Sequence, residues 1–201
     1  IAAGYGIEID VQLRADGAAM VFHDYDLRRL TGQVGAVRLH RSDALGSLAL
    51  KGGDEGIPDL PEVLRLVAGR VPLVVEIKDQ DGAMGPDVGP LEDAVADALR
   101  GYAGPMSVMS FNPHSVRCMA SLLPEVPRGL VTSAYRYDDW PLPAETCDHL
   151  RAIPDYDRVG ACFISHEVSD LTRARVAALK EKGAMICCWT VRSHAEEAQA
   201  R

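Results

Sequence analysis

Short apolar runs, each about as long as one strand, alternate along this chain with segments that have the period of an α-helix. Apolar runs of this kind are typical of strands buried on both faces, as in a parallel sheet covered by helices. The chain is therefore predicted to form a parallel α/β fold. The expected strands are 7–14, 19–23, 71–77, 106–111, 128–131, 161–165 and 185–190, and the expected helices are 57–67, 91–102, 113–123 and 171–182.

Two parallel architectures fit this alternation, an open doubly wound sheet and a closed (β/α)8 barrel. A glycine-rich phosphate-binding motif would favour the doubly wound sheet, but the sequence contains neither G-x-G-x-x-G nor a Walker A motif. Charged residues stand instead at the carboxyl ends of expected strands, where (β/α)8 barrels carry their active sites. These features favour a TIM barrel, and because neither end has the features of a terminus, residues 1–201 are expected to form an incomplete barrel domain.

The first expected strand carries all its charges on one face. Residues 7–14 alternate strictly between apolar and polar types, which is typical of a half-buried strand. Asp16-Gly17 has the composition of a tight turn and is followed by the strand 19–23. If these two residues form a two-residue hairpin turn, Asp10 lies directly opposite His23, with Cβ atoms about 5 Å apart. The pattern therefore predicts that His23 lies beside the charged face.

Two pairs of charged residues share the spacing that puts side chains on one face of a strand. Glu8 and Asp10, about 7 Å apart along the first strand, could hold one hard cation, although alternating charges more often mark a solvated face. Glu76 and Lys78 end an apolar strand and form either a structural ion pair or a metal ligand with a cation for a phosphate oxygen. His23, with an ordinary pKa of about 6.5, is either structural or an acid–base group.

The overall charge and the cysteines restrict the functional class. The chain has 29 Asp and Glu residues against 21 Lys and Arg residues, a formal net charge of −8. A broad nucleic-acid-binding surface needs clustered Lys and Arg and is not expected. No stretch approaches the roughly 18 apolar residues of a membrane-spanning helix. The five cysteines are odd in number and lack C-x-x-C spacing, which indicates reduced cysteines and a cytoplasmic protein.

Taken together, these residues and several motifs resemble the glycerophosphodiester phosphodiesterase family. The most specific motif is the run Ile7-Glu-Ile-Asp-Val-Gln-Leu-Arg-Ala-Asp-Gly-Ala-Ala-Met-Val-Phe-His-Asp24. The motifs that follow it are Leu27-Arg-Arg-Leu-Thr-Gly32, Ile57-Pro-Asp-Leu-Pro-Glu-Val-Leu64, Val75-Glu-Ile-Lys78, Ser110-Phe-Asn-Pro113 and Trp189-Thr-Val191. The resemblance implies a (β/α)8 barrel whose first and last strands lie outside residues 1–201. It also implies that 24–56, after the second strand, is a small insertion over the active site and a candidate lid.

The resemblance implies a role for each candidate residue. The implied ligands of a divalent metal ion, usually Ca or Mg, are Glu8, Asp10 and Glu76. His23 would be a catalytic acid or base, Lys78 would contact the substrate phosphate, and Phe111 and Trp189 would line the pocket.

The sequence departs from the family pattern in three respects. The family's other catalytic His, with its adjacent Arg, is expected before Ile1. Arg192 replaces the family's usual Asn, and Asp59 replaces its usual Thr. The first departure concerns catalysis, and the other two concern the pocket and the start of a helix.

The implied function is a hydrolase of lipid and glycerol metabolism that cleaves glycerophosphodiesters to an alcohol and glycerol 3-phosphate in a metal-dependent reaction. One alternative is a lipid phosphodiesterase of the lysophospholipase D or sphingomyelinase D type, which should have a more apolar rim, and Tyr135, Tyr137 and Trp140 leave it open. The other is a phosphodiester-binding protein without turnover, which would fit the absence of the other His from residues 1–201. A homo-oligomer is compatible with each of these functions.

Overall fold

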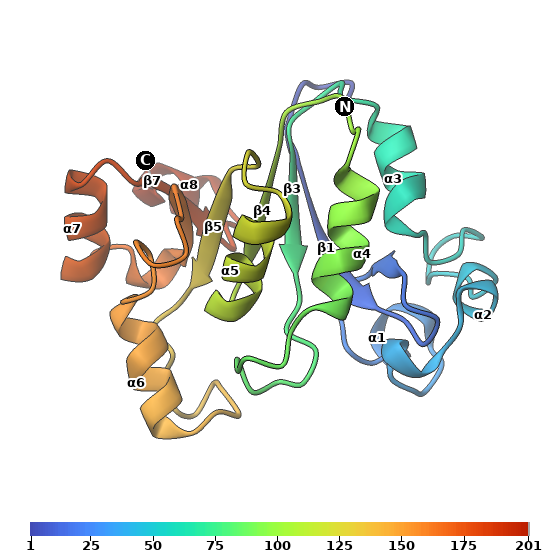
Figure 1. Cartoon of the computed structure of the whole chain (residues 1–201), viewed down its shortest axis with the longest axis horizontal. Helices are drawn as coiled ribbons and strands as arrows, with labels where there is room; N and C mark the ends of the chain where they lie inside the picture. Colours follow the sequence, from blue (N-terminus) through green and yellow to red (C-terminus); the bar gives the residue numbers. More distant parts are fainter. Residues whose placement is uncertain (201) are drawn as a thin grey trace.

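The computed structural model describes residues 1–200, which form a seven-stranded sheet with the order β2-β1-β3-β4-β5-β6-β7 (Figure 1). The strands are β1 (Ile7–Leu13), β2 (Ala19–Val21), β3 (Leu73–Ile77), β4 (Met106–Ser110), β5 (Arg128–Thr132), β6 (Phe163–Glu167) and β7 (Met185–Trp189). All neighbouring pairs are parallel except β1 and β2. From β1 onward, each parallel strand adds to the same side of the one before. This is the order of a (β/α)8 barrel, whereas a doubly wound sheet reverses its order at a switch point.

Helices follow most of the parallel strands and cover them. They are α3 (Leu60–Val67), α4 (Pro90–Leu99), α5 (Pro113–Leu122), α6 (Ala144–Ala152), α7 (Ala174–Glu181) and α8 (His194–Ala200). Leu91, Val95 and Leu99 of α4 pack in one cluster with Leu73 and Val75 of β3. The four predicted helices are confirmed, although their ends differ by a few residues. No helix within residues 1–200 is long and apolar enough to cross a membrane.

Helix α6 is a helix of nine residues that the sequence pattern did not predict. Its buried side chains are Cys147 and Leu150, and the rest of its nine residues are polar, small or exposed. Two buried positions are too few to produce a clear helical period. All five cysteines of the chain are free, as the sequence indicated.

Helix α3 begins at a capping box in which Asp59 works as the N-cap. The Glu62 backbone N–H donates to Asp59 Oδ1 at 2.8 Å, and the Asp59 N–H donates to Glu62 Oε2 at 3.0 Å. Pro61 lies in the first turn, where its missing N–H costs nothing. Asp at position 59 therefore starts this helix as well as a Thr would.

The β1–β2 hairpin differs by one residue from the predicted register. Its turn has three residues, 15–17, and Gly17 takes the left-handed conformation with φ 86° that such a turn requires at its last position. The N–H of Phe22 consequently donates to the Asp10 carbonyl at 2.9 Å. The prediction that Asp10 lies directly opposite His23 is wrong. His23 instead follows the end of β2, on the loop that leaves the hairpin.

Residues 24–56 form a compact segment with short helices, as their composition suggested. The helices are α1 (Arg28–Thr31), the 3-10 helix η1 (Val37–Leu39) and α2 (Ser42–Gly46). Leu27, Val37 and Leu45 are buried together with Met20 and Phe22 in a small core of their own. Figure 1 shows α1 and α2 beyond the carboxyl end of β1, so the segment lies beside the end of the sheet where a barrel active site is expected.

Candidate active site

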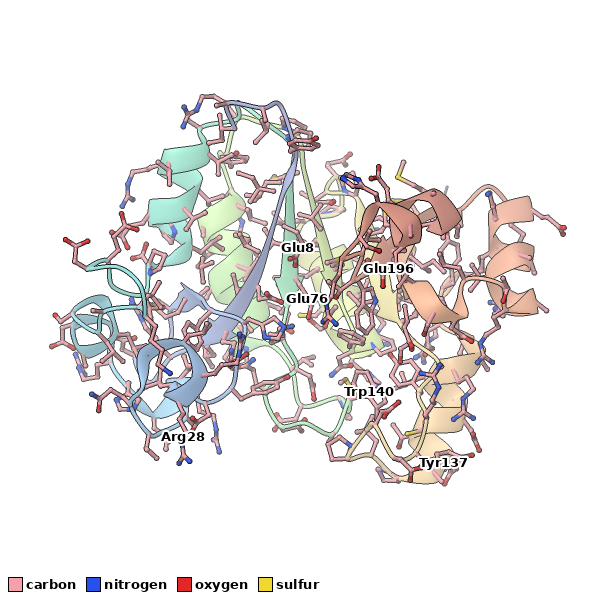
Figure 2. All side chains as sticks on the ribbon, turned by 180° about the vertical axis from the view of Figure 1, so that it is seen from behind. Glu8, Arg28, Glu76, Tyr137, Trp140 and Glu196 are labelled. Carbon is pink, nitrogen blue, oxygen red and sulfur yellow. The ribbon has the colours of Figure 1, made fainter. Side chains whose placement is uncertain are left out.

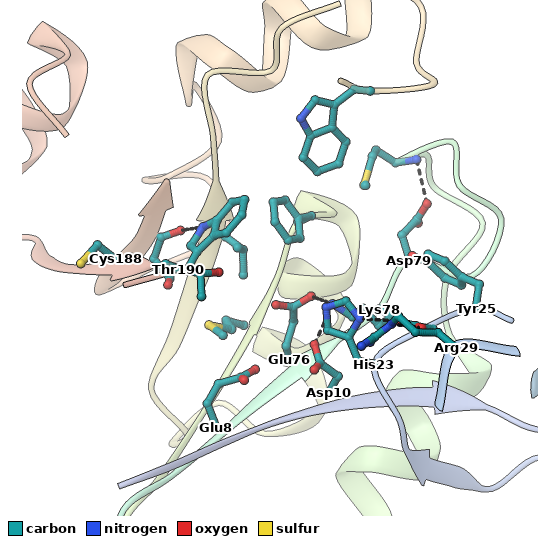
Figure 3. Close-up of a pocket in the computed structure, with 18 of the residues that line it drawn as sticks. Glu8, Asp10, His23, Tyr25, Arg29, Glu76, Lys78, Asp79, Cys188 and Thr190 are labelled. Carbon is teal, nitrogen blue, oxygen red and sulfur yellow. Dashed lines mark hydrogen bonds and ion pairs between the residues drawn. The ribbon is translucent and has the colours of Figure 1, made fainter. Parts of the chain in front are cut away.

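Three carboxylates from two adjacent strands meet at one point. Glu8 and Asp10 lie on β1, Glu76 lies near the end of β3, and the parallel register pairs Asp10 with Glu76. One oxygen from each of the three carboxylates lies within 4.8 Å of the other two (Figure 3). The register of β1 on β3 therefore brings the three predicted metal ligands together, although 66 positions of sequence separate Asp10 from Glu76.

Lys78 is the cation that this cluster already contacts. Its Nζ lies 2.6 Å from Asp10 Oδ1 and 2.6 Å from Glu76 Oε1. Burial lowers the pKa of Lys78, but the charges of Glu76 and Asp10 raise it above its ordinary value. Lys78 therefore stays protonated and offsets one of the three negative charges.

The remaining charge of the cluster is not neutralised by the protein. Burial, followed by the charges of Asp10 and Glu76, raises the pKa of Glu8 from 4.5 to about 7. Burial also raises the pKa of Glu76. One ammonium against three carboxylates leaves an excess of negative charge, and a site with only oxygen donors suits a hard divalent cation. The residues present therefore fit the predicted metal ion.

His23 lines the same cavity from the loop after β2 (Figure 3). Its side chain is 62% exposed, and its Nδ1 lies 2.7 Å from Asp24 Oδ1. Figure 3 shows its ring on the side of the cavity where Asp10 and Glu76 lie, and His23 is among the groups that influence the pKa of Glu76. His23 therefore lines the same cavity as the three carboxylates, although the hairpin register differs by one residue from the predicted one.

The cavity has a volume of about 1530 Å³ and two chemically different walls. Charged groups form one wall, and Phe111, Trp140 and Trp189 form an aromatic wall. The Phe111 ring centroid lies 5.1 Å from that of Trp140 and 5.5 Å from that of Trp189. In Figure 2, Glu8 and Glu76 lie near the middle of the molecule, with Arg28 to one side and Trp140 to the other. The structure places Phe111 and Trp189 in the lining of this cavity, together with Trp140.

Trp189 has a defined orientation in this wall. Its Nε1 lies 3.2 Å from the Thr132 carbonyl oxygen and 3.1 Å from the Ser165 carbonyl oxygen, so the indole N–H donates to the end of β5 and to the middle of β6. Sequence reasoning did not identify several other residues of the lining. They are Asp24, Tyr25, Asp26, Arg28, Arg29, Asp79 and Met84. Arg28 and Arg29 begin the short helix α1, and the others lie on loops, where no periodic pattern marks the side that faces a cavity.

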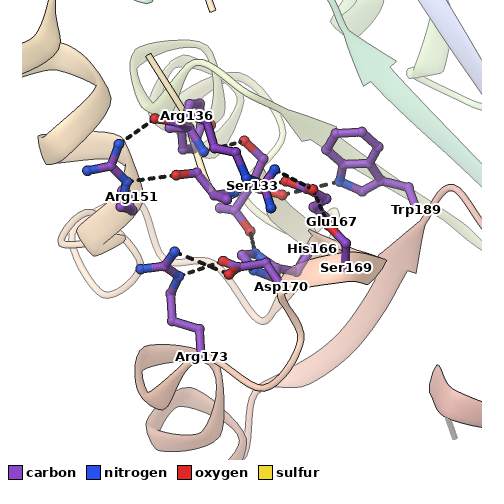
Figure 4. Close-up of polar contacts among 12 residues, drawn as sticks. Ser133, Arg136, Arg151, His166, Glu167, Ser169, Asp170, Arg173 and Trp189 are labelled. Carbon is purple, nitrogen blue, oxygen red and sulfur yellow. Dashed lines mark hydrogen bonds and ion pairs between the residues drawn. The ribbon is translucent and has the colours of Figure 1, made fainter. Parts of the chain in front are cut away.

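Two charged side chains hold the loop that carries Trp140 (Figure 4). Glu167, at the end of β6, accepts from the Ala134 N–H at 3.0 Å and from Arg136 Nη1 at 2.9 Å. Arg151 of α6 donates from Nε to the Ala134 carbonyl at 2.7 Å and from Nη2 to the Tyr135 carbonyl. The aromatic wall is therefore supported by β6 and α6. Neither residue belongs to a motif, because both act on backbone groups that are distant in sequence.

We expect Glu167→Gln to lower the free energy of unfolding by about 1–2 kcal/mol at pH 7, because hydrogen bonds to a charged acceptor are lost. Burial raises the pKa of Glu167, but hydrogen bonds from Ser169, Arg136 and the Ala134 N–H outweigh it and lower the pKa to about 2. The native state therefore favours the ionised form. This stabilisation is complete above about pH 4.5 and is lost as the pH falls toward 2.

Urea unfolding of the wild type and the variant at pH 7, 4.5 and 3 measures this effect. The difference between the two proteins should shrink at pH 3. The exposed Glu125→Gln provides a control with the same change of charge and should match the wild type at each pH. A Glu167→Gln deficit that does not vary with pH would contradict the assignment.

Comparisons with known proteins give consistent results. A model of the glycerophosphoryl diester phosphodiesterase family matches residues 1–201. A glycerophosphodiester phosphodiesterase of Bacillus altitudinis is 42% identical over 79 residues, which cover 36% of this chain and 32% of the relative. Its counterpart in Caldanaerobacter subterraneus subsp. tengcongensis is 32% identical over 144 residues, 67% of this chain and 58% of the relative. The match thus spans less than two thirds of either relative.

A solved structure shares the fold. An Oleispira antarctica phosphodiesterase, solved in complex with the product sn-glycerol-3-phosphate, superposes with a TM-score of 0.74 at 23% sequence identity. The superposition covers 96% of this chain and 74% of that chain. Together with the strand order, this similarity confirms the predicted α/β barrel class.

Proposed function

The chain belongs to the glycerophosphoryl diester phosphodiesterase family, and on this premise we propose that it hydrolyses glycerophosphodiesters to an alcohol and glycerol 3-phosphate. The observation that carries the proposal is the cluster of Glu8, Asp10 and Glu76 in a cavity that also contains His23 and Lys78. The activity named for the two bacterial relatives, and the product bound to the Oleispira antarctica phosphodiesterase, support this substrate class.

Glu8, Asp10 and Glu76 would hold a divalent cation, either Ca²⁺ or Mg²⁺, since both prefer oxygen ligands. When bound, such an ion would polarise a phosphoryl oxygen and stabilise the charge that develops there. The Lys78 ammonium would offset further negative charge on the phosphoryl group. The ion held by the cluster and the neighbouring lysine would thus both stabilise negative charge on the phosphoryl group.

His23 would transfer the proton. Its Nδ1 is engaged with Asp24, so Nε2 is the atom left to exchange a proton with an oxygen of the phosphodiester. The aromatic wall of Phe111, Trp140 and Trp189 would pack against the substrate and exclude water from that side of the cavity. Residues 24–56, which contribute Tyr25 and Arg28 among others to the lining, would cover the site. A cytoplasmic location and a homo-oligomeric state remain predictions.

A coupled assay for glycerol 3-phosphate, released from glycerophosphocholine with and without EDTA, tests the proposed function. We expect release that EDTA abolishes and that added Ca²⁺ or Mg²⁺ restores. Lysophosphatidylcholine serves as the parallel substrate for a lipid phosphodiesterase, and faster turnover of it would favour that alternative. Binding of glycerophosphocholine without any release of product would support the binding protein instead.

A further inference from the structure

The position of His23 in the fold does not by itself restrict the orientation of its side chain. It follows the end of β2 on a loop, and its imidazole is 62% exposed, so little packing restricts its rotamer. A group that transfers a proton must be held within hydrogen-bond reach of the reacting oxygen. Other residues must therefore orient this ring.

The backbone on both sides of His23 is held by one buried amide. Gln12 of β1 is 2% exposed, and its Nε2 donates to the carbonyl oxygen of Phe22 at 3.0 Å and to that of Asp24. These two carbonyls belong to the residues that flank His23. Gln12 lies two positions after Asp10 on the same strand. The strand that supplies two of the carboxylates therefore also fixes the backbone of His23.

The imidazole itself is held by a chain of charged contacts. Asp24 Oδ1 lies 2.7 Å from His23 Nδ1, 2.7 Å from Arg29 Nη2, and Asp24 Oδ2 lies 2.6 Å from Arg29 Nε. The hydrogen bond from Arg29 is the main cause that lowers the pKa of Asp24. An ionised carboxylate only accepts hydrogen bonds, so His23 Nδ1 must donate, and in the neutral imidazole Nε2 is then the nitrogen without a proton. The planar guanidinium holds the carboxylate with two parallel bonds, which restricts its orientation.

Arg29 is in turn anchored in the segment that covers the site. It lies on α1, and Lys51 Nζ donates to the carbonyl oxygens of Arg28 at 3.0 Å and of Arg29 at 2.8 Å. Leu27, directly before this helix, is buried in the small core of the segment. The position of the guanidinium thus follows from the fold of 24–56.

We propose that Asp24 and Arg29 are positioning residues that orient His23 and select its Nδ1–H tautomer, with Arg29 acting only through Asp24. The proposal rests on the function proposed above, in which His23 transfers a proton. It assigns the 24–56 segment a part in catalysis in addition to covering the cavity. An exposed Arg–Asp ion pair by itself would contribute little to stability, so we expect this pair to act by orienting His23.

The test combines two readouts on the full chain. In protein labelled with ¹⁵N-histidine, two-bond ¹H–¹⁵N spectra distinguish the two imidazole tautomers, and the His23 signals are those lost in His23→Gln. We expect the wild type to show Nδ1–H for His23, and Asp24→Ala to shift it toward Nε2–H, the tautomer that free imidazole side chains favour. An unchanged His23 tautomer in Asp24→Ala would overturn the proposal.

Kinetics of glycerol 3-phosphate release then test whether Arg29 works through Asp24. We expect Asp24→Ala to lower kcat about 10- to 100-fold and Arg29→Ala about 3- to 10-fold, with KM nearly unchanged. In the Asp24→Ala background, Arg29→Ala should cause no further loss. An equal loss in both backgrounds, or a rise in KM alone, would show that Arg29 contacts substrate directly and would overturn its positioning role.

Two controls keep the outcomes separate. Arg41→Ala removes another exposed arginine of the same segment and should leave both readouts unchanged. If the wild type releases no glycerol 3-phosphate, the proposed function fails, whereas the tautomer spectra still decide whether Asp24 orients His23.

Discussion

Glu76→Gln is expected to lower kcat/KM for glycerophosphocholine by about 10²- to 10⁴-fold, the loss that follows from several kcal/mol of transition-state stabilisation. Gln keeps the size of the side chain but replaces a carboxylate oxygen with an amide donor. Of the three carboxylates, Glu76 is the least exposed, so water cannot readily take the place of its carboxylate oxygen. The same change should remove most of the heat of Ca²⁺ or Mg²⁺ binding measured by calorimetry.

The control for this experiment is Glu125→Gln, which changes the net charge equally at an exposed site. It should retain wild-type activity and metal binding. Unimpaired turnover in Glu76→Gln, or a wild type whose activity survives EDTA, would contradict the assignment of the cluster as the metal site. Glu8→Gln should act in the same direction, since its carboxylate belongs to the same three-oxygen group.

His23→Gln is expected to lower kcat by about 10²- to 10⁴-fold, the usual contribution of a positioned acid or base. Gln can form hydrogen bonds but cannot exchange a proton at neutral pH, and KM should change little because the charged wall of the cavity remains. His194→Gln, a change on exposed α8, is the matched control. A His23→Gln enzyme with nearly normal kcat would rule out a proton-transfer role.

A substrate with a nitrophenyl leaving group shows which proton His23 transfers. A nitrophenolate departs without protonation, so the His23→Gln defect should shrink with this substrate if the imidazole acts as the general acid. If it acts as the base, the defect should stay the same for both substrates. Either result assigns the role, and the comparison uses the same two proteins.

Local patterns in the sequence predicted the sheet, and the resemblance to a known family implied the chemistry of the site. Side chains alternate between the two faces of a strand, so the spacing of Glu8 with Asp10, and of Glu76 with Lys78, placed each pair on one face. The parallel strand order followed from apolar runs separated by helical segments. These features depend on apolar residues that recur with a period of two in strands and 3.6 in helices, and both periods can be recognised in the sequence alone.

The hairpin register and the contacts around His23 required the tertiary structure. A tight turn at Asp16-Gly17 allows loops of two or three residues, and the difference of one residue decides which side chain faces Asp10. Helix α6 shows too weak a period to be predicted.

The residues that hold the site in place could not be predicted from the sequence. Glu167, Arg151, Gln12 and Arg29 act mainly on backbone carbonyls, N–H groups or a single carboxylate. The contacts that hold the loops and His23 in place join residues between 5 and 33 positions apart. Such bonds impose no repeating pattern on the chain, since any residue offers a carbonyl. The candidate ligands and the fold class can therefore be inferred from the order of residue types, whereas the orientation of His23 and of the aromatic wall arises only when distant loops meet at the end of the sheet.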